Sequence, residues 1–225
     1  MAGAVQLDGA RRPRFYMSAS GLWVGKRLPK KSRRAELIGS LLGRELGVPV
    51  PPVGLCETRP EFVFSAWQDT PSHWARSKAD LADNYESLGA ALALDALIGN
   101  DDRNPRNILL QALERPGKSH MYTLHFIDHE GSLAGDLARL RGLEHEAEPG
   151  SLPPDYPTDV AVLGSAMEAA QCATEISETR VSALVAASCG GDPAAIQNKF
   201  VEALAERLDD ASGIVETYFQ KVHAR

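Results

Sequence analysis

Several features that assign other proteins to a class are missing from this sequence. No uninterrupted apolar run approaches the roughly 20 residues that a membrane-spanning helix needs, and the N-terminus lacks the basic-then-apolar pattern of a secretory signal. The three cysteines, Cys56, Cys172 and Cys189, are odd in number and have no metal-ligand spacing, which argues against a disulfide framework and a zinc cluster. We therefore expect a cytoplasmic protein with reduced thiols.

Basic residues are fewer than acidic residues in this sequence. The 24 Lys and Arg residues against 30 Asp and Glu residues give a formal net charge of -6, which argues against wholesale nucleic-acid binding. Residues 26–34 are locally basic and could bind an anion, but no aromatic residues are interleaved with them for base stacking. The 225 residues, 44% hydrophobic and 24% charged, are typical of a globular protein and can form two lobes around a cleft.

The most informative feature is a polar segment in the middle of the chain. Asp102 and Asn107 are separated by the interval that the kinase catalytic loop, H-R-D-x-x-x-x-N, places between its Asp and Asn. In phosphoryl transfer such an Asp accepts the proton of the attacking hydroxyl, and such an Asn helps to hold Mg²⁺ against the phosphates of ATP. Asp101 is the main rival of Asp102, but its distance from Asn107 fits the pattern less well.

Two strand-like runs follow this segment. Residues 108–110 are apolar, and residues 120–127 form a second run that ends at Asp128, with a turn-forming Gly-Lys-Ser at 117–119 between them. A hairpin of this kind would bring Asn107 and Asp128 close enough to share a metal, and oxygen ligands without a thiolate favour Mg²⁺ over zinc. We expect His129 to flank this metal site and not to bind the metal.

These residues resemble a known family. Residues 97–109, with their Asp-Arg-x-x-x-Asn pattern, and residues 126–133 look like the corresponding segments of the HipA-like kinases and, more distantly, of the phosphatidylinositol 3- and 4-kinases. The resemblance implies an α+β, two-lobed, protein-kinase-like fold, with a reduced β-rich N-lobe over residues 1–68 and a mainly helical C-lobe over residues 69–225. It also implies that Asp102 is the catalytic Asp, and that Asn107 and Asp128 bind the metal.

A kinase N-lobe needs a strand lysine for the phosphates and a helix glutamate that holds the lysine in place. Residues 22–26 are typical of a strand that ends in Lys26, and residues 32–46 are amphipathic at helical spacing and contain Glu36. We predict that Lys26 and Glu36 pair. The helix should end at Gly47, where glycine permits a left-handed cap and prolines follow.

Residues 61–67 form a further β-prone run. From its place in the chain order, this run would supply the hinge that offers backbone groups to adenine. The alternative is that it is an ordinary core strand. No Gly-x-Gly-x-x-Gly occurs before Lys26, so either a partner chain completes the lobe or the phosphates are covered differently. The predicted nucleotide-binding residues are Lys26, Phe64, Ser65, Ala66 and Trp67.

The other segments favour helices. Residues 81–97 should form a helix that leads into the catalytic loop, and the chain is predicted to be helical from residue 158 to its end. Asp192 should cap one of these helices, with Pro193 at its first position.

Three functions from different classes remain. The resemblance implies an ATP- and Mg²⁺-dependent kinase that phosphorylates Ser or Thr of a protein, with growth control of the toxin-antitoxin type. A small-molecule phosphotransferase of the aminoglycoside type uses a similar set of Asp, Asn and Asp, and the acidic residues 144–148 would then bind its cationic substrate. The missing glycine-rich loop suggests a pseudokinase or nucleotide-binding interaction module, but the presence of Asp102, Asn107 and Asp128 counts against it.

Overall fold

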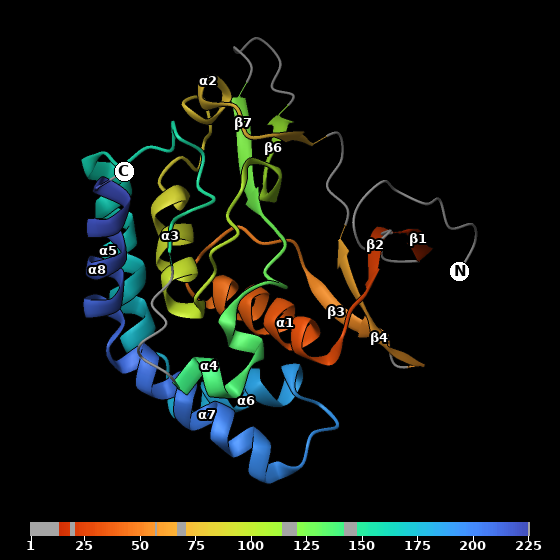
Figure 1. Cartoon of the computed structure of the whole chain (residues 1–225). Helices are drawn as coiled ribbons and strands as arrows, with labels where there is room; N and C mark the ends of the chain where they lie inside the picture. Colours follow the sequence, from red (N-terminus) through yellow and green to blue (C-terminus); the bar gives the residue numbers. More distant parts are fainter. Residues whose placement is uncertain are drawn as a thin grey trace.

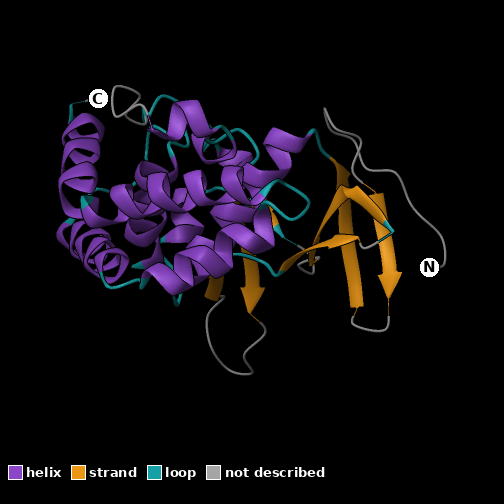
Figure 2. Ribbon diagram, turned by 90° about the horizontal axis from the view of Figure 1, so that it is seen from below, coloured by secondary structure: helices purple, strands orange, loops and turns teal. Residues whose placement is uncertain are grey.

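The fold has a strand-rich part formed by the first third of the chain and a helical part formed by most of the remainder (Figure 1; Figure 2). This mixed α+β architecture confirms the predicted fold class. The computed structural model describes residues 14–18, 21–56, 58–66, 71–113, 121–141 and 148–224.

The strand-rich part is a four-stranded antiparallel sheet in the order β1-β2-β4-β3. β2 lies inside the sheet, and its register with β4 sets Lys26 opposite Val63. Close packing requires glycine at position 25, because a Cβ atom there would lie 2.5 Å from the ring of Tyr16 and 2.7 Å from that of Phe64. The strands are β1 (Arg14–Ser18), β2 (Gly21–Arg27), β3 (Val53–Cys56) and β4 (Arg59–Ala66).

The predicted N-lobe helix is present as α1 (Lys30–Glu45). On its apolar side, Leu37 packs against Val63 of the sheet and Leu28, which follows β2. Ile38 and Leu42 pack into the main core. The helix ends as expected, because Gly47 has a φ of +72°, a conformation that suits glycine. α1 therefore lies between the sheet and the helical part, with one face against each.

The predicted hairpin after the catalytic loop is also present. β6 (Ile108–Leu113) pairs antiparallel with β7 (Met121–Phe126), so that Ile108 faces Phe126. β5 (Ser72–His73) pairs with the other edge of β6. The turn expected at 117–119 lies outside the described residues.

Helices make up the rest, as expected for the C-terminal half. α3 is apolar on every side except at Asp95, and it packs between α1, α5 and α8 as the centre of the core. The helices are α2 (Arg76–Ala79), α3 (Ser87–Ile98), α4 (Leu137–Arg141), α5 (Val160–Thr174), α6 (Glu178–Ser188), α7 (Ala194–Asp209) and α8 (Ala211–His223), with 3-10 turns η1 (Pro105–Asn107) and η2 (Leu133–Gly135).

Two expectations about helix starts were wrong, each because of a tertiary contact. The helix expected from residue 81 begins only at Ser87, and the Asn84 side chain bonds both the N–H and the C=O of Leu124 in β7. Asp192 does not cap α7, which begins after Pro193. Its carboxylate instead binds Lys30 and Arg34 and so ties α1 to the C-terminal helices.

The boundary between the two predicted lobes, 1–68 and 69–225, falls among residues 67–70, which the structure does not describe, so the division stays a prediction. Among the residues that are described, no helix is long and apolar enough to cross a membrane.

The contact between α3 and α5 gives a test of the fold. A Cβ atom at Gly89 would lie 1.9 Å from the Val162 carbonyl oxygen and 2.8 Å from the Ala166 nitrogen. Gly89→Ala should force the helices apart and lower the free energy of unfolding by about 1–3 kcal/mol or more, measured by urea denaturation.

Gly164→Ala is the matched control, because a Cβ atom at that exposed position of α5 would meet nothing within 4 Å. It should raise stability by about 0.5–1 kcal/mol through helix propensity. Equal unfolding midpoints for Gly89→Ala and the wild type would contradict the α3–α5 packing.

Candidate active site

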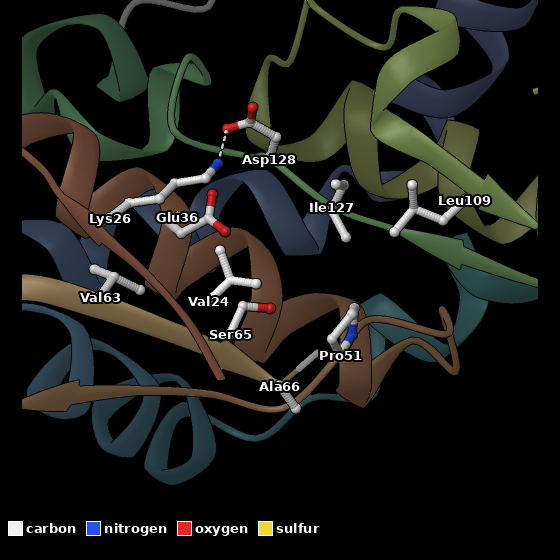
Figure 3. A pocket seen from close by; sticks show the side chains of 10 residues that line it. All are labelled: Val24, Lys26, Glu36, Pro51, Val63, Ser65, Ala66, Leu109, Ile127 and Asp128. Carbon is white, nitrogen blue, oxygen red and sulfur yellow. Dashed lines mark ion pairs between the residues drawn. The ribbon is translucent and has the colours of Figure 1, made fainter. Parts of the chain in front are cut away.

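A pocket lies where the four-stranded sheet, α1 and the end of β7 meet (Figure 3). The pocket is partly open to solvent, and the space inside it, including that open part, is about 500 Å³. One end of the pocket is lined by charged side chains, and the remainder is mainly apolar. Such a pocket suits a ligand that has a polar part and a flat apolar part. Its lining residues are Val24, Lys26, Glu36, Pro51, Val63, Ser65, Ala66, Leu109, Ile127 and Asp128.

Lys26 occupies the charged end. Its Nζ lies 2.9 Å from Oδ1 of Asp128 and 3.7 Å from Oε2 of Glu130 (Figure 3). Burial alone would lower the pKa of Lys26, but the carboxylates of Glu36, Asp128 and Glu130 outweigh it and raise the pKa. The lysine is therefore a fixed cation, and carboxylates outnumber it in this part of the pocket.

Glu36 comes close to Lys26 but does not take it as its hydrogen-bond partner. Its Oε2 accepts a hydrogen bond of 2.7 Å from the backbone N–H of His129, and the side chain is buried. Burial raises the pKa of Glu36 to about 7, even though the charge of Lys26 lowers it. Lys26 thus forms its ion pair with Asp128, while Glu36, whose charge acts on Lys26 more strongly than that of Asp128 or Glu130, holds the backbone beside Asp128.

Asp128 has an unusual backbone. Its φ is 64°, and it is the one non-glycine residue with a positive φ among those described. Asp tolerates the left-handed region better than most residues, but the conformation still costs energy and such residues concentrate at functional sites. The turn directs the Asp128 carboxylate back toward Lys26 in the pocket.

Hydrogen bonds organise the predicted catalytic loop around Asp102. The Asn107 amide nitrogen donates to the Asp102 carbonyl oxygen at 2.7 Å, and the Asn104 amide nitrogen donates to the Asp102 carboxylate at 2.9 Å. Asn104 also accepts from the backbone N–H of Arg106, which starts the 3-10 turn. Asp102 is exposed, so its carboxylate is accessible to an acceptor.

The structure brings the two predicted metal-binding segments together. The Ile127 N–H donates to the Asn107 carbonyl at 3.1 Å, so Asn107 lies beside the residue that precedes Asp128. With its amide nitrogen committed to Asp102, the amide oxygen of Asn107 is the atom that could bind a cation. Within the described ranges no three His, Cys, Asp or Glu side chains could hold a metal ion by themselves, but Mg²⁺ commonly uses one or two protein ligands plus phosphates and water.

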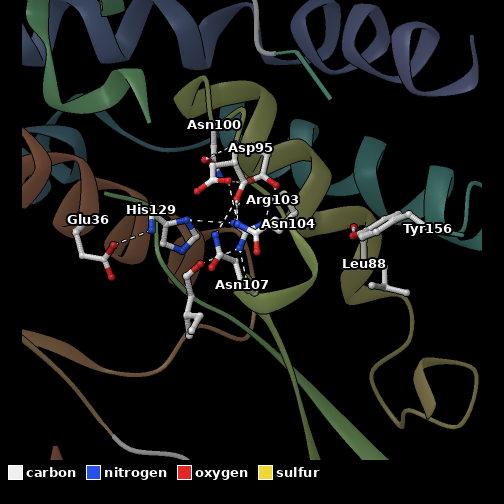
Figure 4. Close-up of polar contacts among 11 residues, drawn as sticks. Glu36, Leu88, Asp95, Asn100, Arg103, Asn104, Asn107, His129 and Tyr156 are labelled. Carbon is white, nitrogen blue, oxygen red and sulfur yellow. Dashed lines mark hydrogen bonds and ion pairs between the residues drawn. The ribbon is translucent and has the colours of Figure 1, made fainter. Parts of the chain in front are cut away.

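One residue that sequence analysis missed is Arg103. It is buried and forms an ion pair with the buried Asp95 of α3 (Figure 4). It also donates to the carbonyl oxygens of Asn107 and Ile127. The available signal was Asp95, a lone carboxylate in an otherwise apolar helix, which needs a buried cation as partner.

The predicted adenine-binding residues are only partly brought together. Ser65 and Ala66 line the pocket. Phe64 does not, because side chains alternate along a strand, and its ring instead packs edge-on against Tyr16 at 5.0 Å. Trp67 lies outside the described residues.

Comparison with known proteins identifies similar folds. No family model and no curated protein matches the sequence. Among solved structures, the proinflammatory kinase CtkA of Helicobacter pylori matches with a TM-score of 0.64 and 12% identity, over 97% of this chain and 94% of that one. HipA of Shewanella oneidensis MR-1, solved with HipB and operator DNA, matches with a TM-score of 0.52 and 11% identity, over 98% of this chain and 68% of that one.

The chain therefore has the fold of HipA-like kinases, and the resemblance seen in the sequence is confirmed at the level of fold. At these identities the similarity concerns the fold alone, and fold by itself does not assign an activity.

Glu36 predicts a pH dependence of stability. Its pKa is about 7 in the folded chain against an ordinary value of 4.5, so the unfolded chain ionises first as the pH rises. The stability linked to its proton is then present below pH 4.5 and lost as the pH passes through about 7. Glu36→Gln should remove this loss, so the stability of the variant relative to wild type should rise between pH 5 and 8, on the order of 3 kcal/mol.

Urea unfolding at several pH values measures this difference. The constant offset caused by the substitution does not matter, because only the trend with pH reports on Glu36. A difference that stays flat from pH 5 to 8 would mean that Glu36 is ionised throughout this range in the folded protein.

Proposed function

We propose that this chain is an ATP- and Mg²⁺-dependent kinase that transfers the γ-phosphate to a hydroxyl group, most simply a Ser or Thr of a protein. The observation that carries the proposal is the convergence of Lys26, Glu36 and Asp128 on one pocket, with Asn107 hydrogen-bonded through its backbone to the residue before Asp128. These residues come from β2, α1, η1 and the segment after β7.

The charge balance of the pocket fits a metal-bound nucleotide. Glu36, Asp128 and Glu130 surround a single lysine, and this arrangement would repel the phosphates of free ATP. Mg²⁺, when bound, would neutralise phosphate charge. Asp128 and the amide oxygen of Asn107 would hold it, and Lys26 would exchange Asp128 for phosphate oxygens when the nucleotide enters.

The apolar part of the pocket suits the base. Val24 and Val63 come from the sheet and Leu109 and Ile127 from the hairpin, so that a flat ring can lie between apolar side chains of two different sheets. Ser65 and Ala66 lie at the end of β4, and because the Ala66 N–H donates to the Pro52 carbonyl oxygen at 2.9 Å, the backbone group of Ala66 that could bond the edge of adenine is its carbonyl oxygen. We therefore propose that Ser65 and Ala66 form the adenine-binding hinge predicted for residues 61–67.

Asp102 would act on the acceptor. Its carboxylate takes the proton of the hydroxyl, the hydroxyl oxygen forms a bond to the γ-phosphorus, and the bond from phosphorus to the ADP oxygen breaks. The hydrogen bond from Asn104 fixes one carboxylate oxygen and leaves the other for the acceptor. Asp102 is exposed, so a residue on a second protein can reach it.

The two alternatives have weaker support. An acidic site for a cationic small molecule was expected at residues 144–148, but only Glu148 lies within the described residues, and its carboxylate is bound to Lys221 at 2.8 Å. A pseudokinase would have no need of the organised loop around Asp102. An antitoxin-like partner, growth control and a partner chain that completes the N-lobe remain proposals that follow from the resemblance.

Replacement of Asp102 tests the chemistry. Asp102→Ala should reduce transfer of labelled γ-phosphate from Mg²⁺-ATP to proteins of a cell extract by about 10²- to 10⁴-fold, because the proton acceptor is lost. ATP binding, measured by thermal shift, should persist. Asp101→Ala is the matched control on the neighbouring exposed carboxylate; if it abolishes transfer while Asp102→Ala does not, Asp102 is the wrong residue.

Replacement of Asp128 tests the metal. Asp128→Asn keeps the side-chain size and tolerates the left-handed backbone, but removes the negative charge that attracts Mg²⁺. Stabilisation by ATP should then become largely independent of Mg²⁺, as read from melting temperatures with and without the metal. Asp136→Asn, which changes a surface carboxylate paired with Lys31, should retain the metal dependence. Unchanged metal dependence in Asp128→Asn would exclude Asp128 as a ligand.

A further inference from the structure

We infer that Arg103, locked in place by Asp95, is a positioning residue that fixes the separation between the two segments that supply the metal ligands. The inference rests on the proposed function, because it concerns the same site. Neither residue touches the nucleotide pocket; both act through the backbone on either side of it.

Arg103 uses all of its hydrogen-bonding capacity inside the protein. A guanidinium has five N–H donors in a rigid fork. Nε and Nη2 donate to the two carboxylate oxygens of Asp95 at 2.9 and 2.8 Å, and Nη2 also reaches Nδ1 of His129 at 3.2 Å. Nη1 donates to the carbonyl oxygens of Asn107 at 3.1 Å and Ile127 at 2.9 Å. Five contacts therefore account for five donors.

The position of Nη1 is the central observation. It bridges the carbonyl group of one proposed metal ligand, Asn107, and that of the residue directly before the other, Asp128. The nitrogen therefore adds a side-chain link to the hydrogen bond that the Ile127 N–H already donates to the Asn107 carbonyl oxygen, between two segments that are about twenty residues apart in the sequence. Asp95 supplies the fixed point, because it projects from the buried helix α3.

The same network continues to α1. The contact with Arg103 makes Nδ1 of His129 the acceptor, so the ring proton is on Nε2. The backbone N–H of His129 donates to Glu36, and a Cβ atom at Gly39 would lie 2.6 Å from His129 Cβ. The segment around Asp128 is thus held from both sides.

Stability alone is a poor reason for this arrangement. Burying a charge pair costs about as much as the attraction returns, and an apolar pair of similar volume is often as stable or more so. An apolar pair cannot hold two carbonyl groups at a fixed distance, whereas a planar fork can. Lysine, with three donors on a flexible stem, would pair with Asp95 without bridging both segments.

The test compares two buried arginines. Arg207 is also buried and donates to the carbonyl oxygens of Leu97 and Ala96, at the end of α3 and outside the nucleotide pocket. Arg103→Lys and Arg207→Lys should both lower the melting temperature. Mn²⁺ binding in the presence of the non-hydrolysable analogue AMP-PNP, followed by electron paramagnetic resonance, should weaken about 10- to 100-fold in Arg103→Lys only.

A second variant separates position from stability. Asp95→Leu combined with Arg103→Met removes both charges together, so no buried charge is left unpaired, and it should recover part of the melting temperature lost in Arg103→Lys without recovering Mn²⁺ affinity. The inference is overturned if this double variant binds Mn²⁺ as the wild type does, or if Arg103→Lys and Arg207→Lys lose affinity equally. Absence of Mn²⁺ binding by the wild type with AMP-PNP would overturn the proposed function as well.

Discussion

The site depends on one buried ion pair, Arg103 with Asp95. The pair lies where α3, the loop of residues 102–107 and the end of β7 meet, and the other hydrogen bonds of Arg103 go to the carbonyl oxygens of Asn107 and Ile127 and to Nδ1 of His129. Removal of either partner would leave a buried charge without compensation, which typically costs 3–5 kcal/mol. The apolar core around α3 therefore contains a polar centre, and this centre holds the loop of residues 102–107 in addition to the loop's own hydrogen bonds.

A chain of contacts connects the Arg103–Asp95 pair to the pocket. His129 contacts Arg103 through its side chain and Glu36 through its backbone, so α1, which carries Glu36, is placed relative to the loop that carries Asp128. Lys26 then meets Asp128 across the pocket. A ligand that separates Lys26 from Asp128 would also shift α1 and the sheet, because these contacts connect them. These contacts form a short path from the pocket to the strand-rich part of the molecule.

Much of the local structure was predictable from the sequence because it depends on neighbours in the chain. The amphipathic pattern gave α1 with its glycine stop, the apolar runs gave β2, β4 and the β6–β7 hairpin, and the spacing of Asp102 and Asn107 indicated the catalytic loop. The errors arose where a distant residue competed with a local signal. Asp192 has the chemistry of a helix cap, but two basic residues of α1 take its carboxylate, and Asn84 pairs with β7 instead of starting α3.

What the sequence determined by itself is the set of chemical groups: a lysine on a strand, a glutamate on a helix, and an Asp, Asn and Asp at kinase-like spacing. Only the tertiary structure decided which of these groups meet. Lys26 contacts Asp128 and not Glu36, and Phe64 lies on the opposite face of β4 from the pocket. Arg103, which reads as part of an exposed Asp-Arg pair, becomes the centre of the site. Spacing fixes contacts only within a few residues, whereas burial and charge compensation between distant segments depend on the whole fold.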